Sequence, residues 1–421
     1  MQIVLMASGT RGDVQPMIAL GIALKAVGHT VRLVAGSNFA TWIESHGLET
    51  YPTADIEALM QSEVGIKWVE SKSPFEQLKT MKTLADSMLE PTIDAVIKGT
   101  KGAELIITGF VTEPHIQAVS EKMGIPMVSC ALQPYRTTRS GAATLMPIIA
   151  RSDSVLNRWM GRMTEWFTWK AYATVVNVLR QRLDLTPHTP RSYSQAASKI
   201  PALYAMSRSV VPPTDDTNSY TTGFWFLDEP FTPPDDLVQF LKSGDAPVYI
   251  GFGSMPSSDP ARTVKMISEA LARIGRRGVI ARGWSKARVT KVPEHIFVLD
   301  KAPHSWLFPQ MAAVVHHGGA GTTSAGLRAG VPSLIIPHMA DQPYWARRVH
   351  ELGVSVAPLK RHELTTESLA ERLILLLNDD TICVRATALG KQIRAEHGVE
   401  NAVEWLQAFI AKLPHRATTT R

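Results

Sequence analysis

The sequence predicts an α/β protein made of two Rossmann-like domains, each built on a parallel sheet. Its 421 residues are enough for two domains with sizeable cores. Short apolar runs alternate with helical stretches in both halves of the chain, which is typical of parallel sheets covered by helices. A stiff, polar segment rich in proline, residues 230–236, separates the halves and predicts a linker.

The first half begins with an apolar strand, residues 2–7, that runs directly into a turn. We expect a helix at 17–27, stopped by Gly28, and a further strand and helix at 30–34 and 39–46. Two more apolar strands are expected at 105–108 and 126–129, on either side of a helix at 113–123.

The second alternation starts at 247–254 and runs to about residue 378. Strands are expected at 312–315 and 333–337, with a helix at 324–329 that Gly330 stops. The predicted domains are 1–229 and 247–395, joined by a linker at 230–246. Residues 396–421 are expected to form a C-terminal helix and tail, and a return of this helix to the first domain stays open.

The composition excludes several classes of protein. A hydrophobic content of 45% and a charged content of 19% describe a globular chain. No run of about 18 apolar residues occurs, so no membrane span is expected. Cys130 and Cys383 form no disulfide framework, which favours a reduced, cytoplasmic protein. A net charge of +6 is too small and dispersed to argue for nucleic-acid binding.

The most informative motif is His-His-Gly-Gly-Ala-Gly-Thr-Thr at residues 316–323. A strand, a glycine-rich turn and a helix in succession present backbone N–H groups and a positive helix end to a phosphate, and an imidazole can add a charge-assisted hydrogen bond. Asp341 and Gln342 follow the next strand at the same edge of the sheet, where they could hold hydroxyl groups. A diphosphate next to a polyol suggests a nucleotide sugar.

Asp13, in Ser-Gly-Thr-Arg-Gly-Asp-Val-Gln-Pro at residues 8–16, is the main catalytic candidate. It is expected in the loop after the first strand, before a helix whose Pro16 suits a first-turn position. Loops at the carboxyl edge carry the chemistry of α/β domains. The alternative is a helix N-cap, which is the commoner use of Asp at such a point. A helix end lowers the pKa of Asp13 and a poorly hydrated cleft raises it, and the residues alone leave this balance open.

The 8–16 motif and residues 301–353, including Pro-His-Ser-Trp-Leu-Phe-Pro at 303–309 and Asp-Gln-Pro-Tyr-Trp at 341–345, resemble family-one glycosyltransferases. The nearest members are the sterol glucosyltransferases and bacterial enzymes that glycosylate lipophilic natural products. This resemblance implies the GT-B fold, in which two Rossmann-like domains face a central cleft. It also implies inverting transfer of a sugar, glucose from UDP-glucose being the first choice and dTDP an open alternative, to a lipophilic alcohol. Asp13 would be the general base, where plant members of the wider family use a histidine that this loop lacks.

The resemblance also implies a set of donor-binding residues. His317 would contact a phosphate, Asp341 and Gln342 would orient the sugar, and His316 is expected as a buried histidine at the strand end. Ala325 stands where plant members carry a ribose-binding glutamate. No Asp-x-Asp motif lies in a suitable place, so neither a metal nor another cofactor is expected. Gly12 would reach the donor from the first domain, and Ser254 would contact a phosphate, with a helix N-cap as the alternative for Ser254. Lys301 and Ala302 would hold the edge of the nucleobase. The residues at the diphosphate would be Gly319, Gly321, Thr322 and Thr323.

A stripe rich in Trp and Met at residues 156–175 marks the acceptor side. Such stripes more often form core, but the resemblance favours a wide apolar pocket, with Trp159, Met163 and Trp166 as lining residues. His115 is added to this pocket, with a surface position at a helix start as the alternative. The cations Arg151, Arg158, Arg162 and Lys170 lie along the same stretch, so we expect at most weak, salt-sensitive contact with anionic membranes.

Two other functions stay open at this point. One is another enzyme of the same architecture, such as a nucleotide-sugar epimerase, which needs no lipophilic acceptor. The other is a non-catalytic donor-binding homologue, against which the combination of Asp13, His317 and Asp341 argues. The sequence leaves the oligomeric state open.

Overall fold

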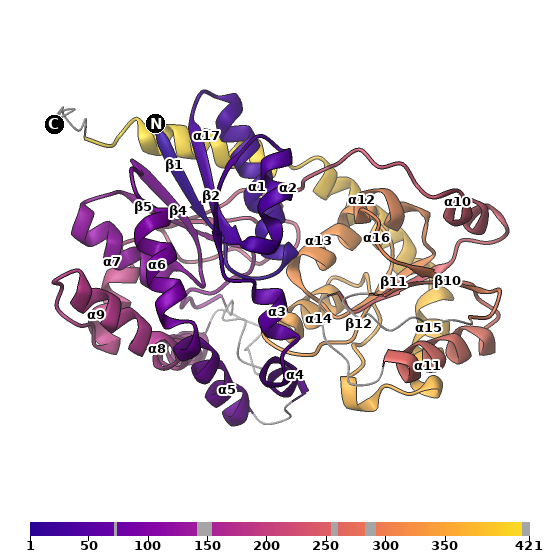
Figure 1. The fold of residues 1–421 in the computed structure, drawn as a ribbon. Helices are drawn as coiled ribbons and strands as arrows, with labels where there is room; N and C mark the ends of the chain where they lie inside the picture. The colour runs from indigo at the N-terminus through magenta and orange to yellow at the C-terminus, as the bar shows by residue number, and fades with distance from the viewer. Residues whose placement is uncertain (71–73, 141–153, 254–259, 283–291, 415–421) are drawn as a thin grey trace.

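The computed structural model describes residues 1–70, 74–140, 154–253, 260–282 and 292–414. Two α/β domains lie side by side, each with a parallel sheet between layers of helices (Figure 1). The predicted fold class is therefore confirmed. Of the residues expected to act on the donor, Ser254 lies outside the described residues.

The sheet of the first domain has seven strands, all parallel, in the order β3-β2-β1-β4-β5-β6-β7. The chain moves outward from β1 to β3 and then returns to the other side of β1, so the strand order reverses between β1 and β4. Open α/β sheets bind their ligands at the carboxyl end of such a reversal. The strands are β1 (Gln2–Met6), β2 (Thr30–Gly36), β3 (Glu49–Thr53), β4 (Leu105–Gly109), β5 (Met127–Ala131), β6 (Ala202–Tyr204) and β7 (Ser219–Thr221).

The sheet of the second domain repeats this plan with five parallel strands, in the order β10-β9-β8-β11-β12. Its reversal falls between β8 and β11, so the segments after these two strands meet at one edge. The strands are β8 (Val248–Gly251), β9 (Gly278–Ala281), β10 (Ile296–Leu299), β11 (Ala313–His316) and β12 (Ser333–Ile335).

Helices cover both faces of the first sheet, and the last helix of the chain is one of them (Figure 1). Helix α17 packs on α1, and its Ala402, Val403 and Leu406 belong to the same buried cluster as strand β1. The helices are α1 (Arg11–Ala26), η1 (Ser37–Phe39), α2 (Ala40–Ser45), α3 (Ile56–Met60), α4 (Glu63–Glu70), α5 (Pro74–Ser87), α6 (Leu89–Gly99), α7 (Glu113–Met123), α8 (Val155–Arg182), α9 (Pro190–Ala197) and α17 (Gly398–Ile410).

The segment predicted as a linker, 230–246, contains a helix of the second domain. Helix α10 turns its fully buried Leu237 into the core below β8 and β9, which the proline-rich start of the segment concealed. The helices of this domain are α10 (Asp235–Lys242), α11 (Pro260–Arg273), α12 (His304–Leu307), η2 (Phe308–Gln310), α13 (Ala320–Ala329), α14 (Gln342–Glu351), η3 (Arg361–Glu363), α15 (Thr366–Leu377) and α16 (Asp380–Arg394).

The two domains share a buried hydrophobic cluster. Trp345 of α14 is fully buried in it, together with Leu327 of α13 and, from the first domain, Tyr204 and Phe224. Burial of apolar area contributes roughly 25 cal/mol per Å². The domains are therefore held together by core packing as well as by the chain that joins them.

The chain crosses between the domains at two places. At the first crossing, Asp228 accepts two hydrogen bonds from Arg328 of α13, and Glu229 pairs with Arg11 at the start of α1. At the second crossing, before α17, Gly398 lies against Gly223 of the first domain. A side chain on Gly398 would collide with the backbone of residues 223 and 224. Within the described residues, no helix is both long and apolar enough to cross a membrane.

The contact between α17 and α1 gives a test of stability. Leu406 is fully buried, so Leu406→Ala should lower the free energy of unfolding by about 2–5 kcal/mol, the usual cost of such a cavity. Leu375→Ala is the matched control, because Leu375 is 55% exposed on α15. Denaturant titration of both variants measures the difference, and equal losses would show that α17 adds no core.

Candidate active site

The carboxyl edges of the two sheets face each other, and two helix starts meet there. Helix α1 follows β1 in the first domain and α13 follows β11 in the second. A methyl group placed on Gly321 would lie 3.5 Å from Cα of Gly12, so the space between the two backbones is about the size of one methyl group. Both glycines belong to the predicted donor site, and the structure places them on opposite walls of one cleft.

Asp13 lies in the first turn of α1, not in a loop before it, and the N-cap of that helix is Thr10. The expected helix at 17–27 therefore began six residues too late. The carboxylate Oδ2 of Asp13 accepts hydrogen bonds from the N–H of Thr10 at 2.8 Å and from its hydroxyl at 3.4 Å. Gly9 has φ +143°, and a side chain there would lie 2.1 Å from the same oxygen, so only glycine leaves room for the carboxylate.

Burial decides the pKa of Asp13. Desolvation raises it to about 6, although the hydrogen bonds from Thr10 act in the opposite direction. The carboxylate borders a small cavity of about 20 Å³, which it shares with Met17, Phe110 and Gln133. Desolvation therefore raises the pKa of Asp13 by more than the hydrogen bonds at the helix start lower it. With a pKa of about 6, Asp13 can act as a base near neutral pH.

The N-terminus of α13 is open to an anion. Its N-cap is Gly319, in an extended conformation, and no side chain caps the helix. The first hydrogen bond inside the helix runs from the N–H of Thr323 to the carbonyl of Gly319, so the N–H groups of residues 320–322 precede it. Thr322 is half-buried at this end, whereas the Thr323 side chain is 1% exposed and its hydroxyl has no partner among the described residues.

His317 stands in a slot between two glycines. A side chain on Gly253 would lie 2.7 Å from its Cε1, and one on Gly319 would lie 2.5 Å from its Nε2. The ring is 8% exposed, and its Nδ1 has no hydrogen-bond partner in the described part of the chain. Gly253, at φ +58°, was missed as a site residue, although it directly precedes Ser254, which was predicted to bind the donor.

Burial also sets the charge of the histidines. It lowers the pKa of His317 to about 4, so this imidazole is neutral at pH 7 and offers an N–H without a full positive charge. A hydrogen bond from this neutral imidazole to a phosphate would be assisted by the charge of the phosphate alone. His316 is fully buried, as a strand-end residue should be, and its Nδ1 accepts a hydrogen bond from the N–H of Gly318.

Asp341 of the second domain lies close enough to Asp13 of the first for their charges to interact. Desolvation raises its pKa to about 7, a hydrogen bond from Trp345 Nε1 at 2.8 Å opposes this, and the nearby charge of Asp13 raises it further. Ala340, directly before it, has the uncommon φ of 53°. The amide oxygen of Gln342 accepts hydrogen bonds from the N–H groups of residues 338 and 339, so it closes this loop and is not available to a ligand hydroxyl.

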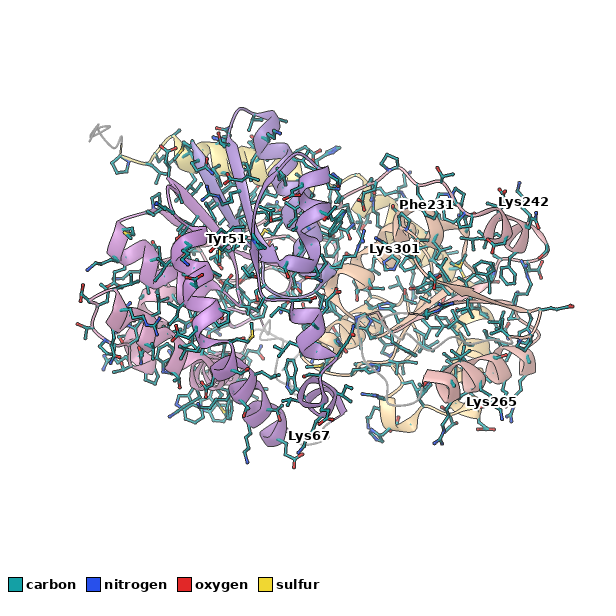
Figure 2. The ribbon with its side chains drawn as sticks, in the orientation of Figure 1. Tyr51, Lys67, Phe231, Lys242, Lys265 and Lys301 are labelled. Atoms are coloured by element: carbon teal, nitrogen blue, oxygen red, sulfur yellow. The ribbon has the colours of Figure 1, made fainter. Side chains whose placement is uncertain are left out.

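The base-edge residues lie where the second domain faces the first. Figure 2 shows Lys301 at this border. Desolvation and the positive charge of Arg11 lower the pKa of Lys301, which places it near the start of α1. Ala302 is half-buried and packs on the core of the second domain.

The predicted acceptor residues on α8 do not line a described cavity. Trp159 and Trp166 are 58% and 46% exposed on the outer side of the helix, and Met163 is half-buried. The apolar stripe predicted at residues 156–175 is thus divided between two sides of the helix, because Met160, Trp169 and Val175 are buried. Helical spacing alone could not separate the two sides, since both carry large apolar residues.

His115 is buried, which excludes the surface position considered for it. It packs edge-to-face on Tyr172 of α8, with ring centroids 5.8 Å apart, and its Nδ1 has no partner among the described residues. Burial lowers its pKa to about 4. It lies in the contact between α7 and α8 and lines neither described cavity.

A second cavity, of about 350 Å³, lies next to the one at Asp13, and the two share Phe110 and Gln133. Phe110 follows β4 and Gln133 follows the neighbouring strand β5, and sequence reasoning missed both because the segments around them carry no chemical signature. In the described part of the chain, no group of three His, Cys, Asp or Glu is arranged to hold a metal ion.

Two domain families match the chain. Residues 3–105 match the glycosyltransferase family 28 N-terminal domain, and residues 265–408 match the erythromycin biosynthesis protein CIII-like C-terminal domain. Two sterol 3-beta-glucosyltransferases of Arabidopsis thaliana are 37% and 33% identical over 98% of the chain, which spans 66% and 68% of them. A sterol 3-beta-glucosyltransferase of Neurospora crassa is 34% identical, and the chain spans 27% of it.

Solved structures show the same fold at lower identity. The calicheamicin glycosyltransferase CalG4 gives a TM-score of 0.70 at 18% identity, over 98% of this chain and 99% of that one. The glycosyltransferase VinC, solved in complex with dTDP, gives 0.68 at 18% identity, over 98% and 100%. With its two parallel sheets facing one cleft, the chain belongs to the GT-B glycosyltransferases, in the family that includes the sterol 3-beta-glucosyltransferases.

Proposed function

We propose that the protein is an inverting glycosyltransferase that moves a sugar, glucose by first choice, from a UDP-sugar to a hydroxyl group of a lipophilic acceptor. The observation that carries this proposal is the meeting of Asp13 with the uncapped start of α13 and with Asp341 in one cleft. The relatives named as sterol 3-beta-glucosyltransferases support a sterol-like acceptor.

In the proposed reaction, the acceptor oxygen attacks the anomeric carbon of an α-linked sugar while the bond from that carbon to the diphosphate breaks. Asp13 removes the hydroxyl proton, and a β-glycoside and the nucleoside diphosphate are the products. Negative charge grows on the departing diphosphate, where the N–H groups at the start of α13 and the neutral His317 would stabilise it. This helix end would serve in place of a metal ion.

The first prediction concerns the base. With a pKa of about 6, Asp13 is ionised above that pH, so kcat/KM should rise with pH through about 6 and be lost below it. Asp13→Asn should remove this limb and lower turnover roughly 10²- to 10⁴-fold, the usual contribution of a general base. Glycosylation assays across pH measure both effects.

Asp86→Asn is the control for this experiment, since Asp86 lies on α5, where it pairs with Lys82. Release of the nucleoside diphosphate should depend on added alcohol, which an epimerase would not require. Near-normal turnover of Asp13→Asn with an unactivated alcohol would refute the role of Asp13.

The second prediction separates the phosphate from the sugar. His317→Ala should weaken UDP-sugar and UDP alike, because His317 is assigned to the diphosphate. Asp341→Ala should weaken the UDP-sugar much more than UDP, because Asp341 is assigned to sugar hydroxyls. Calorimetric titration of both ligands against both variants tests this. Equal losses of the two ligands in Asp341→Ala would contradict its assignment.

The third prediction concerns membranes. The exposed Trp159 and Trp166 on α8 lie beside exposed cations, with Lys170 Nζ 5.4 Å from the Trp166 ring centroid. We expect weak adsorption to anionic vesicles that high salt removes, because a few exposed cations are readily screened. Co-sedimentation at low and high salt measures this adsorption, with neutral vesicles as the control. Tight, salt-resistant binding would contradict it.

A further inference from the structure

The larger cavity continues the acceptor side of the cleft away from Asp13. Phe110 and Gln133 line both cavities, so the two are neighbours, and these two side chains are all that a ligand bound at Asp13 has to pass or displace to enter the larger one. Its walls come from α7, α8, α9 and the loops that follow β5 and precede β7. With about 350 Å³, it can hold a sizeable part of a ligand.

The lining of this cavity is rich in polar residues, unlike the apolar pocket expected from the sequence, although the apolar parts of its side chains make up the larger share of its surface. Of its 18 described lining residues, eight carry hydroxyl groups, seven are charged types and one is an amide, which leaves Phe110 and Ala197 as the apolar members. A wholly apolar ligand would strip water from these groups without replacing its hydrogen bonds, at a cost of about 1–3 kcal/mol for each group left unpaired.

Most of the charged side chains in the lining are already held by partners. The two carboxylate oxygens of Glu165 accept hydrogen bonds from Thr137 at 2.5 Å and from Ser194 at 3.0 Å. Arg136 pairs with Asp216 at 3.3 Å, and Arg158 with Asp215 at 2.9 Å. Since the lining holds three arginines and four acids, it does not favour an anion. The lining instead offers both hydrogen-bond donors and hydrogen-bond acceptors, most of them held in place by the contacts just described.

Two hydroxyl groups in the lining remain to be paired. Those of Thr168 and Tyr193 have no hydrogen-bond partner among the described residues, and neither oxygen is sealed from the cavity. The Tyr193 ring is held in place because it stacks on Trp169, with ring centroids 4.8 Å apart. These hydroxyls are therefore positioned to bind polar groups of a ligand.

On the basis of the proposed function, we propose that this cavity binds a polyhydroxylated part of the acceptor, remote from the hydroxyl group that is glycosylated. The acceptor class is then a lipophile that carries several hydroxyl groups, or a sugar, at its far end. Fixed carboxylates and guanidinium groups, free hydroxyls and an aromatic ring together supply the partners that an array of hydroxyl groups requires. A site built to bond such groups discriminates against an analogue that lacks them.

Two acceptors on one ring system test this inference: a sterol with a single hydroxyl group, and the same sterol with additional hydroxyls at the far end. The polyhydroxylated sterol should have the higher kcat/KM, by about tenfold or more, since one hydrogen bond contributes about 1 kcal/mol and several are formed. Tyr193→Phe keeps the stacked ring and removes only the hydroxyl. It should lower kcat/KM about five- to tenfold for the polyhydroxylated sterol and leave the other acceptor nearly unchanged.

Tyr220→Phe is the matched control, because Tyr220 is half-buried in β7 and lines neither cavity. Calorimetric titration of the polyhydroxylated sterol into the wild type and Tyr193→Phe adds a measure that is independent of turnover. Preference for the monohydroxylated sterol, or equal affinity of the wild type and Tyr193→Phe, would overturn the inference while glycosyl transfer stands. Failure of every sugar donor with every alcohol would instead remove the proposed function, and the titration would still decide whether the cavity binds hydroxyl groups.

Discussion

The contact between the starts of α1 and α13 is the constraint on which the rest of the site depends. Both helices direct a positive end toward the place where Gly12 and Gly321 lie opposite each other, with room for about one methyl group between them. Two such ends repel each other unless negative charge lies between them. Helix α1 supplies its own, through Asp13 in its capping box, whereas no side chain caps α13. This difference assigns the two ends distinct tasks, because one already holds a carboxylate and the other can receive an anion.

Burial shifts the pKa values of the acids and of the histidine in opposite directions, because in both cases it disfavours the charged form. Desolvation raises the pKa of Asp13 and Asp341 to about 6 and 7, and it lowers the pKa of His317 to about 4. The cluster around Trp345, which joins the domains beside Asp341, is part of what keeps water away. Near neutral pH the site therefore combines a carboxylate that can take a proton with an imidazole that carries no charge. The positive end of α13 and its N–H groups, and not a charged imidazole, would therefore attract a diphosphate.

Much of the fold could be predicted from the sequence because strands buried on both faces stand out as short apolar runs. Helix α7 occupies the predicted residues, Glu113–Met123. The start of α1 was missed although its capping box, Thr10 followed three residues later by Asp13, was present in the sequence. The acceptor side was less legible, because α8 carries large apolar residues on both its buried and its exposed sides. The role of Phe110 and Gln133 depends on how strand ends far apart in the sequence meet, which no local pattern encodes.

The two crossings of the chain have a mechanical consequence. Asp228 and Glu229 are consecutive, yet the first is bound to Arg328 of one domain and the second to Arg11 of the other. The return crossing is pinned at Gly398, against Gly223. Together with the buried cluster around Trp345, these two crossings attach the domains at three places, so a change in their relative orientation has to disturb at least one of the three. The relative position of Asp13 and α13 is therefore set by contacts made outside the site, at the two crossings and in this cluster.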